Sequence, residues 1–378
     1  MNSGKYEFDR EGRRLFRPTI PQFPRPEDIV EPLRSATAAL AEFDNRLSTL
    51  DNPEPLCRLF NRLDAVCSSA AEGSTTSFRT LMEYESDLRI APDRHDAAGV
   101  SAVSNALDTP IPKDDLIAFI LSIHHQLFKD APNVSMAATA WTFKKRPNFV
   151  RDTDSPSSLF GYTAPSSVQS ALSAWSTFTL ARDNEANELV RQILSHWVFE
   201  HIHPVSDGNG RIGRLLVPTV MRSKGATQNA CTFLGEAIHK DKSLYIEILK
   251  DARVSGNPTN YVRQMLRFLQ KTAESNIARL DAIEAIKADW SARRAAVNNG
   301  VVFQLCRYAI AKPVFNVNEV QRALNVNLTT ADMATRMLFD EGVLTSPDDP
   351  RRDSLFYADA VIRLFDDPKA GQWHTPCR

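Results

Sequence analysis

One stretch near the middle of the chain, residues 201–216, reads HIHPVSDGNGRIGRLL. The residues before it repeat apolar side chains at steps of three and four, which predicts a helix with one apolar face. A proline pushes the preceding residue out of the α region, so Pro204 is expected to end that helix and to leave His203 at its end. The two glycines at 208–210 permit a turn with positive φ values. We expect a second apolar helix to begin near Arg211.

This turn and the helix after it combine groups that bind phosphate. The first turn of a helix has unpaired N–H groups and a partial positive charge, which attract phosphate. Arg211 and Arg214 are three residues apart on one face of that turn, and arginine forks suit phosphate oxygens. Asp207 offers a single carboxylate, which is how Mg²⁺ is often held beside substrate oxygens and water. His203 can accept a proton near neutral pH. These parts predict a site for a nucleotide polyphosphate and a metal ion.

The same residues resemble the signature of the Fic family, HPFx[D/E]GNGRxxR. The matching positions are His203, Pro204, Asp207, Gly208, Asn209, Gly210, Arg211 and Arg214. Val205 stands where the family usually has Phe, and we expect it to point inward, so the change removes no chemical group. The resemblance implies transfer of AMP from ATP to a Ser, Thr or Tyr hydroxyl of a target protein, with Mg²⁺ as cofactor.

The resemblance also implies a role for each residue. His203 is the catalytic base, and Asp207 is the metal ligand. The residues implied to bind the nucleotide are Asp207, Gly208, Asn209, Gly210, Arg211, Ile212, Gly213, Arg214 and Tyr245. Tyr245 is included because the family has an aromatic residue beside the adenine; this chain has Leu244-Tyr245 where two tyrosines are frequent.

The interpretation of a second segment, residues 68–73, depends on the motif at 201–216. By itself it is a helix end with a solvated Glu72, and Gly73 is typical of a helix C-cap. The pattern Ser68-x-x-x-Glu72-Gly73 resembles the inhibitory helix of the Fic family. The resemblance implies that Glu72 holds Arg214, which the γ-phosphate of ATP needs, so that the chain inhibits itself. Removal of AMP, with Glu72 positioning a water, is a variant of the same site.

Two other site classes compete for the same residues. Gly208, Gly210 and Gly213 also spell GxGxxG, but the dinucleotide fingerprint requires a preceding strand and a βαβ unit, whereas a helix precedes it here. A Walker A loop is absent from the sequence. A zinc site would need converging ligands, and His196 and His201 are five apart on a helix, which points them to different sides.

Composition places the chain among soluble globular proteins, with 43% apolar and 24% charged residues. The net charge of −1 does not indicate a general binder of nucleic acid or of membrane surfaces. The N-terminus lacks the apolar core of a signal peptide, and no apolar run reaches the length of a membrane span. The five cysteines are scattered without a CxxC pair, which favours a reducing compartment. We expect a cytoplasmic protein without a membrane segment.

Periodicity along the chain predicts a mainly α fold. The resemblance implies a Fic-type helical core with a β-hairpin flap, and two β-prone runs at 149–151 and 159–162 flank a turn cluster where that flap belongs. Residues 1–26 are polar and rich in proline, and we expect them to be extended on the surface. The predicted domains are an N-terminal helical region with the inhibitory helix (1–110), the catalytic core (111–290) and a C-terminal unit (297–366).

The C-terminal unit resembles a winged helix-turn-helix, with helices at 317–324 and 329–341 and a β-wing after Gly342. Thr329 or Thr330 is the expected cap of the second helix. Such units often bind DNA, but the second helix places Arg336 among acidic residues, which is poor for a phosphate backbone. Recruitment of the target or formation of a homodimer is favoured, and self-modification is compatible with either. The rival function is a nucleotide-sensing DNA-binding regulator without catalysis.

Overall fold

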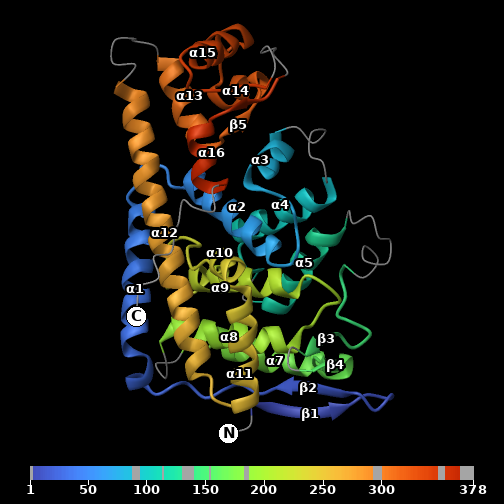
Figure 1. The fold of residues 1–378 in the computed structure, drawn as a ribbon. Coiled ribbons are helices and arrows are strands. Elements are labelled where there is room, and N and C mark those ends of the chain that lie inside the picture. Colours follow the sequence, from blue (N-terminus) through green and yellow to red (C-terminus); the bar gives the residue numbers. More distant parts are fainter. Residues whose placement is uncertain are drawn as a thin grey trace.

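The computed structural model describes residues 3–86, 94–112, 115–129, 140–152, 155–182, 187–292, 300–347 and 354–366. It is mostly helical, as predicted (Figure 1). The helices are α1 (Pro26–Ser48), α2 (Glu54–Ala70), α3 (Phe78–Ser86), α4 (Arg94–Asp108), α5 (Leu116–Phe128), the 3₁₀ turn η2 (Pro165–Ser167), α7 (Val168–Leu180), α8 (Glu188–Ile202), α9 (Asn209–Ser223), α10 (Gly235–Lys240), α11 (Lys242–Ser255), α12 (Thr259–Ala292), α13 (Gly300–Ala311), α14 (Val317–Leu324), α15 (Leu328–Asp340) and α16 (Asp359–Asp366). The strands are β1 (Gly4–Phe8), β2 (Arg14–Pro18), β3 (Phe149–Asp152), β4 (Ser155–Gly161), β5 (Val314–Phe315) and β6 (Phe356–Tyr357). None of the helices among these residues is both long and apolar enough to cross a membrane.

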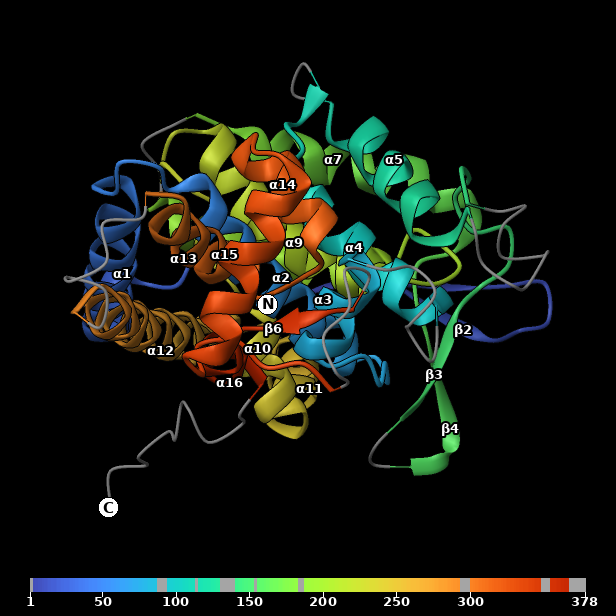
Figure 2. The ribbon, with the colours of Figure 1, turned by 90° about the horizontal axis from the view of Figure 1, so that it is seen from above.

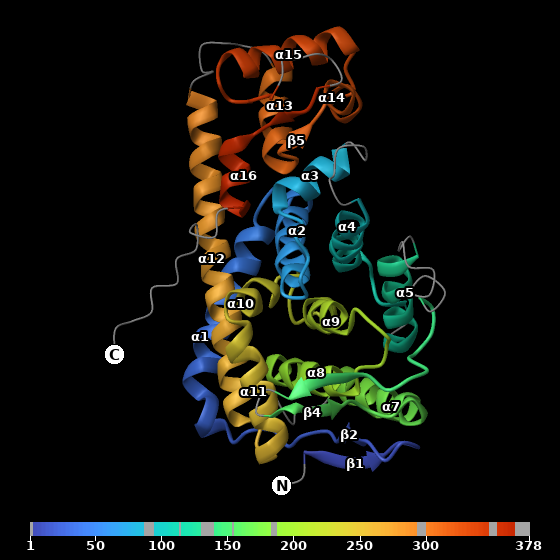
Figure 3. The same ribbon diagram turned by 45° about the vertical axis from the view of Figure 1, so that its right-hand side comes forward.

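Helices α8 and α9 lie at the centre of the molecule. Asn187 caps α8 by accepting a hydrogen bond from the N–H of Leu189 at 2.9 Å. The helix is buried from Leu189 to its end at Ile202, just before the His-Pro pair. Helix α9 begins at Asn209, slightly earlier than predicted, because Gly208 adopts a φ of 82° and turns the chain into it. Figure 3 shows α9 between α8 on one side and α2 and α4 on the other.

A long pair of helices, α1 and α12, covers one side of this centre (Figures 1 and 3). They run in the same direction, because contacts join their starts and also their later turns. Arg263 Nε donates to the carbonyl of Asp28 at 2.6 Å, and Arg46 pairs with Asp281 at 2.6 Å. The pair spans from the sheet to the C-terminal unit and so connects the two ends of the molecule.

The predicted flap hairpin is present as β3 and β4, which pair Val150 with Phe160 and Arg151 with Leu159. The N-terminal segment is extended, as expected, but it is not confined to the surface. Strands β1 and β2 form a second hairpin, and β2 joins β4 at Leu15 and Gly161, so the sheet order is β1-β2-β4-β3. Leu15 and Phe16 of β2 are buried, because Phe16 packs against the rings of Trp197 and His201 on α8. Figure 2 shows the flap projecting from the helical body.

The C-terminal unit contains the two predicted helices as α14 and α15. The cap of α15 was predicted wrongly: Asn327 is the N-cap and accepts from the N–H of Thr330 at 2.8 Å, so Thr330 lies inside the first turn. Strands β5 and β6 pair, and Thr345 bridges to Tyr357. The tip of the predicted wing, residues 348–353, lies outside the described residues. The assignment as a winged helix stays a prediction.

This unit packs directly against the N-terminal helices. Phe365 of α16 stacks on Phe78 of α3, with ring centroids 4.8 Å apart, and also contacts Phe60 of α2. The carboxylate of Asp366 accepts a hydrogen bond from the N–H of Phe78 at 3.0 Å, and Arg79 pairs with Asp359 at 2.5 Å. The predicted first and third domains therefore share one apolar core.

Candidate active site

His203 stands at the C-cap of α8 in the left-handed conformation, with φ 50° and ψ 61°. Its Nδ1 lies 3.2 Å from the carbonyl oxygen of Glu200, and a carbonyl can only accept, so the proton is on Nδ1. The remaining ring nitrogen, Nε2, is then free to accept a proton. The ring of Tyr162 stacks on the imidazole at 3.9 Å and 11°. Burial, together with the charge of Lys144, lowers the pKa of His203 to about 3. His203 is therefore a neutral base at pH 7.

Arg214 is fully buried on α9 and is held by Ser68 of α2 and by Glu72, which follows that helix. Its Nε donates to the hydroxyl of Ser68 at 2.7 Å, and its second nitrogen donates to the Ser68 carbonyl at 2.8 Å. The same nitrogen forms an ion pair of 2.7 Å with Glu72. Burial raises the pKa of Glu72, but the charge and hydrogen bond of Arg214 outweigh it and hold that pKa below its usual range. Glu72 is therefore an ionised ligand of Arg214 at neutral pH. Gly73 follows with a φ of 96° and turns the chain away.

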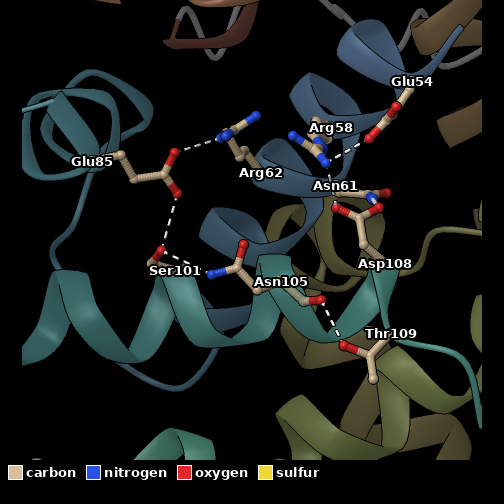
Figure 4. Close-up of polar contacts among 9 residues, drawn as sticks. All are labelled: Glu54, Arg58, Asn61, Arg62, Glu85, Ser101, Asn105, Asp108 and Thr109. Carbon is tan, nitrogen blue, oxygen red and sulfur yellow. Dashed lines mark hydrogen bonds and ion pairs between the residues drawn. The ribbon is translucent and has the colours of Figure 1, made fainter. Parts of the chain in front are cut away.

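Helix α2, which carries Ser68, is fixed to its neighbouring helices by polar contacts (Figure 4). Arg62 donates to Glu85 of α3 at 2.7 Å, and Ser101 of α4 donates to the same carboxylate at 3.0 Å. Asn61 donates to Asp108 at the end of α4 at 2.8 Å. These contacts tie α2 to α3 and α4, so the position of Glu72 depends on the packing of this helical region.

A cavity of about 320 Å³ opens between α8, α9, α11 and the flap. It is lined by several of the predicted site residues, namely Glu72, His203, Gly210, Arg214 and Tyr245. The flap contributes Val150, Arg151 and Phe160, and α11 contributes the cations Lys242, Lys250 and Arg253. Lys242 Nζ also donates to the carbonyl of Ala71, at the end of the helix that carries Ser68. The cavity thus combines a neutral base, a buried arginine and an additional cationic rim.

Other predicted residues support the structure around the cavity. The amide of Asn209 accepts from the N–H of Val205 at 3.0 Å and donates to its carbonyl at 2.9 Å, so it closes the turn between the two helices. Ile212 is buried in the core. A Cβ at Gly213 would lie 2.2 Å from the carboxylate of Glu200, so a larger residue there would displace that carboxylate. The hydroxyl of Tyr245 lies 3.0 Å from His196 Nε2.

Asp207 and Arg211 lie at the start of α9. Asp207 is exposed, and its carboxylate accepts from the N–H of Gly208 at 2.6 Å. The guanidinium of Arg211 lies 5.3 Å from the centroid of the Phe128 ring. Burial lowers the pKa of Arg211, although the negative charge of Asp207 acts in the other direction. Among the described residues no group of three or more His, Cys, Asp or Glu side chains could hold a metal. A single exposed carboxylate fits Mg²⁺, which takes most of its ligands from substrate phosphate and water.

Three residues that the sequence did not single out adjoin His203 or the cavity. Tyr162 stacks on His203; it belongs to the predicted hairpin, but nothing in the sequence shows where its ring points. Lys144 is buried beside the His-Pro turn, and a lysine in a polar run gives no sign of burial. Glu200 lines the cavity, and burial raises its pKa to about 7, against the charge of Arg214. The one available signal in the sequence was its position within the helix that the apolar periodicity predicts before His203.

Comparison with known proteins shows to which family the chain is related. The profile of the Fic/DOC family matches residues 115–221, and the profile of the Fic/DOC family N-terminal region matches residues 30–110. The chain belongs to the Fic/DOC family. The Fic profile ends within α9, so it covers the complete motif of this Fic protein.

A curated relative, named protein adenylyltransferase Fic, from Nematostella vectensis, is 24% identical to this Fic protein over 220 residues. The match covers 56% of this chain and 47% of the relative, so the chain spans about half the length of that protein. A crystal structure of a Fic family protein from Desulfovibrio desulfuricans G20 has a TM-score of 0.55 at 18% identity and covers 90% of this chain and 98% of that chain. Fic-1 (aa134–508) from C. elegans has a TM-score of 0.51 at 17% identity and covers 66% and 73%. Both solved structures share the fold.

Proposed function

We propose that this Fic protein is a protein adenylyltransferase, which transfers AMP from ATP to a Ser, Thr or Tyr hydroxyl. The observation that carries the proposal is the common cavity of His203, Gly210 and Arg214. A neutral base, the start of a helix and a buried arginine there face one volume. The relative named adenylyltransferase supports the choice of AMP as the transferred group.

The chain's own residues account for the steps. Nε2 of His203 takes the proton of the target hydroxyl, and the oxygen attacks the α-phosphorus of ATP. The bond from the α-phosphorus to the bridging oxygen breaks, and pyrophosphate leaves. N–H groups at the start of α9, with Arg211 and Arg214, hold the phosphates in line. Mg²⁺ bound at Asp207 would neutralise charge on the phosphates.

We further propose that the chain is inhibited in the conformation observed. Arg214 is the γ-phosphate ligand in this scheme, and Glu72 occupies it at 2.7 Å. ATP could then bind only with its γ-phosphate displaced, which misplaces the α-phosphorus for attack. Since positioning supplies much of the catalysis in phosphoryl transfer, the misplacement lowers the rate. The same carboxylate could position a water for removal of AMP.

The target is proposed to bind along the flap. Strand β3 is at the edge of the sheet, and an extended target segment can add to such an edge through backbone hydrogen bonds. The C-terminal unit is proposed to recruit the target or a second copy of the chain. On α15, Arg336 pairs with Asp332 at 3.2 Å, which supports this choice over DNA. The described cysteines are free thiols, in keeping with a cytoplasmic location.

The test is incubation of the protein with Mg²⁺ and ATP labelled at the α-phosphate, followed by intact-mass and peptide mass spectrometry. We expect an AMP adduct on the chain or on an added target, and none with His203→Ala at equal nucleotide affinity. An adduct formed at the wild-type rate by His203→Ala would remove the base from the mechanism. Salt-dependent binding to a defined DNA duplex without any adduct would favour the regulator instead.

A further inference from the structure

A short segment, residues 144–148, crosses over the turn that contains His203. The N–H of Lys144 donates to the carbonyl of Pro204 at 2.9 Å, and its Nζ donates to the carbonyl of Ile202 at 3.2 Å. The side chain of Asn148 donates to the carbonyls of Val205 and Ser206 at 3.4 and 3.0 Å. We call this segment the strap. It holds backbone carbonyls on both sides of His203.

The backbone of His203 needs such support. A residue with a Cβ is strained in the left-handed region and persists there only when surrounding contacts enforce it. Among the described residues, the other non-glycine residue with a positive φ is Asn325. Asn tolerates that region well, and the His203 ring is held locally by its bond to the Glu200 carbonyl and by the stack on Tyr162. The strap supplies the fixed carbonyl positions that keep His203 there.

Lys144 at this buried position loses the hydration of its ammonium group, which is unfavourable. Its side chain is buried, with 4% exposure, and its Nζ bond goes to a carbonyl. No carboxylate among the described residues offsets this burial, which lowers the pKa of Lys144 to about 7. A buried ammonium without a carboxylate is strongly disfavoured, and a methionine would fill a similar volume without that cost. What Lys144 adds is a side-chain donor to the last carbonyl of α8, one residue before His203.

We propose that Lys144 is a positioning residue, which fixes the turn around His203 so that Nε2 faces the cavity. The inference rests on the proposed function for its catalytic consequence. It acts on the backbone on both sides of His203, whereas the bond to the Glu200 carbonyl and the stack on Tyr162 orient the ring itself. Because Lys144 acts on the flanking backbone and the other two contacts act on the ring, loss of Lys144 is expected to loosen the ring without removing the base.

The test compares Lys144→Met, Lys144→Arg and the neighbouring Lys145→Met, which changes an exposed lysine of the same segment. Each is made in a Glu72→Gly background, so that turnover can be measured. We expect Lys144→Met to lower kcat about tenfold or more with the KM for ATP nearly unchanged, because the ring is misplaced and the nucleotide contacts are not. Lys144→Arg should restore part of the rate, and Lys145→Met should match the background.

A second measurement does not need activity. In protein labelled with ¹³C-histidine, the Cε1–Hε1 signal of His203 should shift or broaden in Lys144→Met, while that of the distant His239 stays in place. If Lys144→Met does not fold, Asn148→Ala, which removes two of the strap's bonds, and Lys144→Arg are used for both measurements. An unchanged His203 signal with unchanged kcat would overturn the proposal. Absence of AMP transfer in every protein would refute the proposed function, and the His203 signal would still decide the role of Lys144.

Discussion

At the residue scale, the contact between Glu72 and Arg214 decides how active the resting protein is. Glu72→Gly removes the competitor for Arg214 and should raise AMP incorporation by about tenfold or more, since each 1.4 kcal/mol taken from an inhibited state multiplies the competent population about tenfold. The Glu72 side chain is 40% exposed and follows the last turn of α2, so the fold should survive. Incorporation of labelled AMP is the measurement.

Arg214→Ala and Glu72→Gln are the matched controls for this prediction. Arg214→Ala frees the site but discards the γ-phosphate ligand, so it should not raise incorporation. Glu72→Gln keeps the volume and removes the charge, so it should be intermediate. Equal incorporation by the wild type and Glu72→Gly would contradict autoinhibition, even if transfer itself were demonstrated.

The buried histidines give a second prediction at this scale. Burial lowers the pKa of His201 to about 3, although its Nδ1 donates to the Trp197 carbonyl at 2.8 Å. The unfolded chain therefore binds more protons below about pH 6.5, so the stability from His201 is complete above that pH and is lost as pH falls toward 3. His201→Leu should flatten the loss of unfolding free energy between pH 6 and 4 by up to about 1.4 kcal/mol per pH unit.

Other groups titrate in the same range, so the difference between the two proteins is the informative quantity. Burial also lowers the pKa of His196 and His203, so their contributions to stability change with pH in the same direction as that of His201. Burial raises the pKa of Glu200 and Asp64, so their contributions change in the opposite direction. Urea unfolding of both proteins at several pH values measures the slopes. Parallel slopes would show that His201 is not kept neutral in the fold.

At the element scale, the packing of α2 on α10 depends on one glycine. A Cβ at Gly235 would lie 2.5 Å from the carbonyl of Asp64 and 2.9 Å from the N–H of Ser68, both backbone atoms of α2. Gly235→Ala must therefore push the two helices apart, and overpacking of this kind costs about 1–3 kcal/mol. Denaturant unfolding checks the loss. Gly300→Ala is the control, because no atom lies within 4 Å of its added Cβ, and it should be nearly neutral.

Elements with strong local signals could be predicted from the sequence. The apolar periodicity placed α8, α9 and α14, Pro204 marked the end of α8, and the β-prone runs around a turn cluster placed the flap. The hairpin of β1 and β2 was missed as a hairpin because its charged residues hide a short apolar pair, Leu15 and Phe16, whose burial depends on α8. The same limit applies at the site: Lys144 meets Ile202 from 58 residues away in the chain, and local patterns carry no such information.

At the scale of the whole molecule, the C-terminal unit is joined to the region that carries Glu72. The sequence suggested a separate unit after residue 296, but α16 closes the apolar core of α2 and α3. Asp366 also accepts the N–H of Phe78 at the start of α3. Helix α12 adds a second connection, because Arg279 donates to the carbonyl of Leu364 at 3.1 Å. Deletion of the unit would therefore expose the helices that position α2.

Phe365 provides the test of this integration. Its ring is buried between Phe60 and Phe78, so Phe365→Ala should lower the unfolding free energy by about 3–5 kcal/mol, as for other buried phenylalanines. Phe303→Ala is the matched control in the same unit, since that ring is 47% exposed, and it should cost far less. If the molecule is one cooperative unit, hydrogen exchange in Phe365→Ala should accelerate in α2 and α3 as well as in α16. Acceleration confined to α13–α16 would show instead that the C-terminal unit unfolds alone and that its contact with α3 contributes little to holding Glu72 in place.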